Sequence, residues 1–93
     1  MTVATLRLDL RVVNCRSPGE KRRRMRVMMD KLHRSFNVSV AAVDHDQDPL
    51  GLTLAAVAVA GSRHLVRELL ARVADAVAVY PGTEILSHDI TEV

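Results

Sequence analysis

The chain has 93 residues, of which 48% are hydrophobic and 26% charged, and its net charge is +2. These values are ordinary for a globular protein and exclude an intrinsically disordered chain, and no apolar run approaches the roughly 20 residues that span a bilayer. The length predicts one domain, residues 1–93. A single cysteine excludes an internal disulfide, so we expect the protein in the reducing cytoplasm.

The first two elements predicted along the chain are a strand and a helix. Residues 3–13 predict a strand, because apolar and charged side chains alternate with the period of two that marks a half-buried strand. Ser17 to Glu20 then fits a capping box, with Ser17 as N-cap, Pro18 at the first helical position and Glu20 at the third. The helix that follows has one apolar face, made of Met25, Met28, Met29, Leu32 and Phe36.

The remaining elements follow in order: a strand at 38–44, a loop at 45–51, a strand at 52–60, a helix between Ser62 and Pro81, and a strand at 85–90. Residues 52–60 are apolar on both faces and short, and Gly51 and Gly61 bound them, which favours a covered central strand over a helix. Ser62 fits a second N-cap, and the helix should end where Pro81 and Gly82 interrupt it.

The predicted order βαββαβ indicates an α+β, ferredoxin-like domain with two helices on one face of a four-stranded antiparallel sheet. If Leu52 and Leu54 face the helices, small apolar side chains lie on the opposite, uncovered face. An exposed apolar patch is uncommon on a monomer, so we expect a homo-oligomer, a dimer or higher, to form through this face. The interface residues predicted here are Ala41, Val43, Ala55, Val57 and Val59, with Thr53 between them.

Positive charge is concentrated in the first helix and the turn before it. From Arg16 to Arg34 there are eight Lys or Arg residues against Glu20 and Asp30, a net charge of +6, which leaves −4 for the rest of the chain. On a helical wheel Arg22, Arg23, Arg26 and Arg34 share the solvent side. Such a stripe suits phosphate contacts, and the residues predicted to make them are Arg16, Lys21, Arg22, Arg23, Arg26 and Arg34.

Two observations limit this hypothesis. Eleven of the thirteen basic residues are Arg, as codon bias in a GC-rich genome produces, so an ordinary solvated helix face is the alternative. The only aromatic residues, Phe36 and Tyr80, lie outside the first and third strands, so the base-stacking sheet of an RRM is absent. Any contact with RNA should therefore be electrostatic and strongly dependent on salt.

Cys15 precedes a helix N-terminus, where a thiol pKa is lowered and anions are favoured, which raises the alternative of a small enzyme acting on phosphorylated or acyl substrates through Cys15 and Arg16. The Cys-x5-Arg loop of cysteine phosphatases would, however, need Arg where Lys21 stands. Pro18 also removes a backbone donor from the loop. We therefore expect Cys15 to be a partly buried residue at a strand end and the protein to be no enzyme.

The Asp-rich stretch DHDQD, residues 44–48, resembles the start of a calcium-binding loop. An EF-hand would need Gly and Glu where Pro49 and Ala55 stand, so we expect a solvated turn. The other histidines are His33, His64 and His88; they lie on separate elements without zinc-site spacing. The sequence thus predicts no metal and no cofactor.

The segments CRSPGEKRRRMR and FNVSVAAVD, at this separation, resemble the YlxP-like family of small bacterial proteins of unknown function. The matching positions are Arg16, Ser17, Lys21, Arg22, Phe36, Asn37 and Ser39. The resemblance implies a ferredoxin-like fold and, from the genes that neighbour family members, a role near RNA or the ribosome; it implies no catalytic residues. Pro18-Gly19 replaces the usual Leu-Lys pair, and the usual loop Trp is missing.

From these observations we expect a non-enzymatic cytoplasmic protein that self-associates and contacts RNA, ribosomal RNA in particular, through its basic first helix. One alternative is a structural homo-oligomer, or a protein-interaction module, that binds no RNA. The other is the small Cys15 enzyme.

Overall fold

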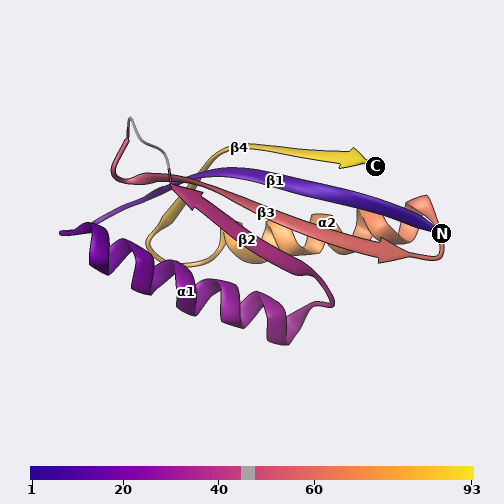
Figure 1. The fold of residues 1–93 in the computed structure, drawn as a ribbon, viewed down its shortest axis with the longest axis horizontal. Coiled ribbons are helices and arrows are strands. Elements are labelled where there is room, and N and C mark those ends of the chain that lie inside the picture. Colours follow the sequence, from indigo (N-terminus) through magenta and orange to yellow (C-terminus); the bar gives the residue numbers. More distant parts are fainter. Residues whose placement is uncertain (45–47) are drawn as a thin grey trace.

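The computed structural model describes residues 1–44 and 48–93 (Figure 1). The elements are β1 (Thr2–Val12), α1 (Pro18–Ser35), β2 (Ser39–Asp44), β3 (Gly51–Ala60), α2 (Arg63–Ala78) and β4 (Thr83–Glu92). The four strands form one antiparallel sheet in the order β2-β3-β1-β4. The predicted ferredoxin-like fold is confirmed, and the main difference is that β4 is longer than residues 85–90.

Strand alternation sets which side chains are buried. In β1 every second residue from Ala4 to Val12 is fully buried, and Leu8 lies opposite Leu54 of β3. Leu52 and Leu54 are each 1% exposed, so the predicted facing of β3 toward the helices is confirmed. The helices complete the core through Met25, Met28, Leu32, Val66, Leu70, Val73 and Val77.

Both helices begin at the predicted caps. The Ser17 hydroxyl accepts a hydrogen bond from the Glu20 backbone N–H at 3.1 Å, and the Ser62 hydroxyl accepts one from Leu65 at 3.2 Å. Figure 1 shows α1 running alongside β2 near one edge of the sheet, while α2 lies behind the strands in the middle. This edge position leaves a broad side of α1 free of the sheet. In residues 1–44 and 48–93 no helix is both long and apolar enough to cross a membrane.

The uncovered sheet face is divided into an apolar half and a polar half. On β2 and β3 it presents the predicted apolar residues, with Val43 64%, Val57 39% and Val59 51% exposed. On β1 the same face presents Val3 opposite Val59 and, from Thr5 onward, polar and charged side chains, with Arg7 opposite Ala55 and Asp9 opposite Thr53. The apolar surface available to a partner is therefore concentrated on the β2–β3 half.

The loop between β2 and β3 is described only in part. The prediction of a solvated turn at residues 44–48 lies mostly outside the described residues, because 45–47 are not included. The Asp48 carboxylate accepts a hydrogen bond from the Leu50 N–H at 3.0 Å, which is the local turn chemistry expected of Asp at such a position.

Candidate functional site

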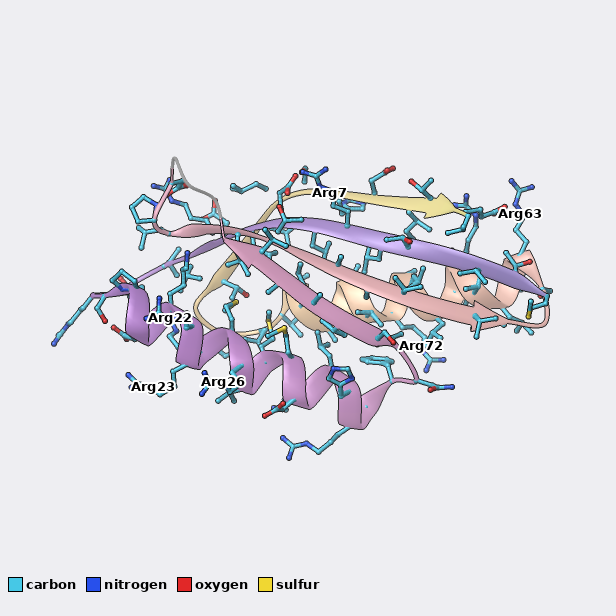
Figure 2. The ribbon with its side chains drawn as sticks, viewed as in Figure 1. Arg7, Arg22, Arg23, Arg26, Arg63 and Arg72 are labelled. Carbon is cyan, nitrogen blue, oxygen red and sulfur yellow. The ribbon has the colours of Figure 1, made fainter. Side chains whose placement is uncertain are left out.

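Five arginines on and just before α1 are exposed and have no partner among the described residues. Arg23, Arg26 and Arg34 are exposed on the side of α1 away from its buried methionines, and Arg22 is exposed on the flank of the helix beside Met25. Arg16 is exposed just before the helix. Within residues 1–44 and 48–93, none of these five guanidinium groups has a hydrogen bond or an ion pair. Figure 2 shows Arg22, Arg23 and Arg26 grouped at the end of the molecule opposite Arg63. We call these five residues the α1 arginine stripe.

Lys21 does not belong to this stripe, which corrects the prediction that it contacts phosphate from the helix surface. Its side chain is only 4% exposed, and its ammonium donates a hydrogen bond to the Gly51 carbonyl at 3.2 Å. The physical reason is helical spacing: Lys21 lies four residues before Met25 and therefore on the buried side of α1. Lys21 joins the start of α1 to the start of β3.

The contrast between Lys21 and its neighbour gives a stability prediction. We expect Lys21→Ala to lower the free energy of unfolding by about 1–3 kcal/mol, because the Gly51 carbonyl loses its donor and the buried stem is removed. The matched variant Arg22→Ala removes an exposed side chain that has no partner among the described residues, so its effect on the free energy of unfolding should stay within about 0.5 kcal/mol. Urea unfolding of the two variants measures this difference, and equal losses would contradict the assignment of Lys21 to the core.

Arg24 is a second member of the basic run with a structural role, and the sequence did not reveal it. Its guanidinium donates to the carbonyls of Val13 at 2.9 Å and Gly82 at 3.0 Å, so it links the end of β1 to the turn before β4. Gly82 has a φ of +81°, and a Cβ at that position would lie 1.8 Å from the Arg24 guanidinium. Arg24 and Gly82 therefore fit each other, and Arg24 is not available to a ligand as the stripe residues are.

Two polar groups of the loop around Cys15, one thiol and one backbone N–H, are engaged within the chain. The Cys15 thiol donates to the Ser17 carbonyl at 3.3 Å, and the Arg16 N–H donates to the Glu20 carboxylate at 2.9 Å. The Glu20 carboxylate therefore already accepts from the Arg16 backbone N–H, a donor that a phosphate bound in this loop would need. Cys15 packs partly against the core. This arrangement favours the structural interpretation of Cys15 over the nucleophilic one.

A hydrogen-bonded carboxylate lies on the uncovered sheet face, where sequence reasoning did not place one. Asp9 accepts hydrogen bonds from the hydroxyls of Thr53 on β3 and Ser87 on β4, each at 2.8 Å, and Arg7 lies 3.5 Å away. The Thr53 bond, then the Ser87 bond, and then the Arg7 charge lower the pKa of Asp9 below its ordinary value of 3.8. The cluster joins three strands across the polar half of the face.

Asp9 also gives a prediction about pH. Because the pKa of Asp9 is lowered in the folded state, its contribution to stability is present above the unfolded value near 3.8 and is lost as pH falls through the folded value. The stability advantage of the wild type over Asp9→Asn should therefore shrink as pH falls from about 6 to about 2. Urea unfolding of both proteins across this range measures the difference in their free energies of unfolding. A difference that stays constant with pH would contradict the role given to the ionised carboxylate.

The arginines at the start of α2 differ from those of the stripe because they have a partner. Arg63 and Arg67 both donate to the Glu92 carboxylate at the end of β4, the latter at 2.7 Å. The bonds from Arg67 and then Arg63 lower the pKa of Glu92. These two arginines are one helical turn apart, as Arg22 and Arg26 are, so they form a matched pair for comparison.

The fold resembles several solved structures. A protein assigned as an antibiotic biosynthesis monooxygenase from Chloroflexus aurantiacus has a TM-score of 0.61 at 18% identity, covering 96% of this chain and 90% of that one. SnoaB, a cofactor-independent oxygenase from Streptomyces nogalater, has a TM-score of 0.56 at 15% identity with the same coverage of each chain. The de novo designed protein Foldit4 has a TM-score of 0.55 at 12% identity and covers 96% of both chains.

These similarities establish the fold alone, since identities are low and a designed protein shares the architecture with oxygenases. No curated protein matches the chain. A family model does match it, over residues 3–90, nearly the whole sequence. The chain therefore belongs to DUF503, a family described as proteins of unknown function.

Proposed function

We propose that this protein is a non-enzymatic, cytoplasmic RNA-binding protein of the YlxP-like type within its family, with ribosomal RNA as its target. The α1 arginine stripe contacts the phosphate backbone, and the apolar half of the uncovered sheet face joins copies of the chain into a homo-oligomer. Neither activity needs a metal or a cofactor.

The observation that carries the proposal is the exposure of five arginines without a carboxylate partner among the described residues. Side chains on an exposed helix face often pair with the opposite charge at a spacing of three or four. Asp30 lies on this face four residues from both Arg26 and Arg34, yet within residues 1–44 and 48–93 it forms no ion pair with either. Phosphate groups fit guanidinium groups by charge and by bidentate hydrogen bonding. Lys21 and Arg24 are engaged with backbone carbonyls. The stripe therefore includes only some of the basic residues between Arg16 and Arg34.

The arrangement of the sheet favours α1 as the RNA contact. Phe36 and Tyr80 lie outside β1 and β3, so these two strands have no Phe, Tyr or Trp with which to stack bases. The uncovered face of the sheet has an apolar half instead. Exposed valines grouped on neighbouring strands favour a protein partner, and an identical copy is the simplest one.

The test is a titration of a fluorescently labelled ribosomal RNA fragment with the wild-type protein at ~50 mM salt, followed by anisotropy. We expect saturable binding that weakens steadily as salt is added. Light scattering of the same sample should give a mass of two or more chains. Absence of binding at low salt would contradict the RNA-binding part, and a single-chain mass would contradict self-association.

A further inference from the structure

A groove with aromatic, apolar and cationic walls runs beside the α1 arginine stripe. It consists of two adjoining hollows that share Lys31, Tyr80 and Pro81. One, of about 300 Å³, lies between the C-terminal halves of the helices and includes Leu32 and Phe36. The other, of about 500 Å³, continues toward the start of α1. We call the two hollows together the Tyr80 groove.

The charged side chains in the described lining of the groove are all basic. Arg23 and Lys31 line the groove with exposed cationic groups, and the described lining includes no acidic residue. Arg24 also lines it, but its guanidinium is engaged with the Val13 and Gly82 carbonyls. Its walls include two unusually exposed apolar side chains, Val27 at 51% and Val79 at 81%. Such a combination fits a ligand that is flat and apolar in one part and anionic in another.

Tyr80 supplies the stacking surface. Its ring is half-buried in the groove wall, and the Lys31 ammonium lies 5.9 Å from the ring centroid, near the outer limit of a cation–π contact. Lys31 is exposed, so its flexible chain is free to move to a neighbouring phosphate when a flat group occupies the ring face. The Lys31 ammonium thus suits the phosphate of a nucleotide, and the Tyr80 ring suits its base.

Arg23 connects the groove to the stripe, because it belongs to both. A strand whose phosphates follow the stripe therefore passes the mouth of the groove. We infer that the Tyr80 groove binds an unpaired RNA base stacked on Tyr80, so that the protein prefers single-stranded RNA segments to duplex. This inference rests on the proposed function. A duplex keeps its bases stacked inside and offers only phosphates to the same surface.

The sequence provides a direct probe of this groove. Tyr80 is the only tyrosine and the chain has no tryptophan, so all tyrosine fluorescence comes from this site. We expect a single-stranded oligouridine of about 12 nucleotides to quench this emission along its binding curve. An RNA duplex of equal length should bind without comparable quenching. Free N-acetyltyrosinamide in the same RNA solutions corrects for absorption by the RNA.

Two substitutions test the stacking contact. Tyr80→Leu keeps an apolar side chain but removes the ring, so it should weaken binding of the single strand about 5- to 100-fold. Duplex binding should be unchanged, because a duplex does not stack a base on Tyr80. Tyr80→Phe keeps the ring and should bind within about twofold of the wild type. Thermal unfolding of each variant shows that the fold is retained, and the fluorescence of the wild type supports or refutes the contact without any variant.

The outcomes separate this inference from the proposed function. Equal affinity for single strand and duplex, with no quenching and no effect of Tyr80→Leu, overturns the inference; if substitutions in the stripe still weaken binding, the proposed function stands. Failure of the wild type to bind either RNA overturns both.

Discussion

Replacing Arg22 and Arg26 together with glutamine is expected to weaken RNA binding about 10- to 100-fold at ~50 mM salt. The two side chains are exposed one turn apart on α1 and have no partner among the described residues. Each phosphate contact releases a condensed counterion from the RNA, and at low salt this release contributes roughly a factor of ten per contact. Glutamine keeps the helix propensity and polarity of the position, so the fold should be unaffected.

The matched control is the double variant Arg63→Gln and Arg67→Gln. This pair is also one turn apart on a helix and changes the net charge by the same amount, but it lies at α2 and already binds Glu92. Arg63 lies at the opposite end of the molecule from Arg22, Arg23 and Arg26 in Figure 2. RNA affinity of the control should stay within about threefold of the wild type, measured by anisotropy. Equal losses in both variants would show that overall charge, rather than the stripe, determines binding.

Val57→Asp is expected to convert the homo-oligomer to a monomer. Val57 is 39% exposed and lies on the uncovered face between Ser39 of β2 and Thr5 of β1. In an interface between identical copies each substitution acts in both chains, so two carboxylates would lose water without gaining a partner. A buried unpaired charge costs about 3–5 kcal/mol, which corresponds to a rise in the dissociation constant of at least ~100-fold.

Leu65→Asp is the matched control for this prediction. Leu65 is 53% exposed in the first turn of α2, away from the uncovered sheet face, and an acidic side chain there is favourable for the helix. Sedimentation should show an oligomer for the control and a monomer for Val57→Asp. If Val57→Asp assembles as well as the wild type does, the interface lies elsewhere.

The architecture could be predicted because each element carries its own periodicity. Alternation in β1 and the facing of Leu52 and Leu54 specify one buried face of the sheet, and Ser17 and Ser62 specify where the helices begin. The apolar half of the uncovered face followed from the same alternation. These features depend on residues close together in the sequence.

The features that could not be predicted depend on distant partners. Arg24 looks like its neighbours in the sequence, yet it binds a carbonyl of Gly82, 58 residues away. Asp9 accepts hydrogen bonds from the hydroxyls of Thr53 and Ser87, which lie 44 and 78 positions away in the sequence. Lys21 is different, because helical spacing from Met25 already placed it on the buried side; the run of identical charges obscured that signal.

The Tyr80 groove belongs to the same class of long-range feature. Tyr80 follows α2, and only the return of the chain beside α1 places its ring near Lys31 and Arg23. The sequence analysis placed both Phe36 and Tyr80 outside the first and third strands. It could not show that Tyr80 lies next to the basic helix.

The most direct test of phosphate binding by the α1 arginine stripe is the dependence of RNA affinity on salt. If all five stripe arginines contact phosphates, a plot of the logarithm of the association constant against that of the salt concentration should have a slope of about −3.5 for single-stranded RNA. The slope should become shallower by about 1.4 when Arg22 and Arg26 are replaced with glutamine. A slope near zero for the wild type, or an identical slope for the variant, would contradict the assignment of the stripe as the RNA contact.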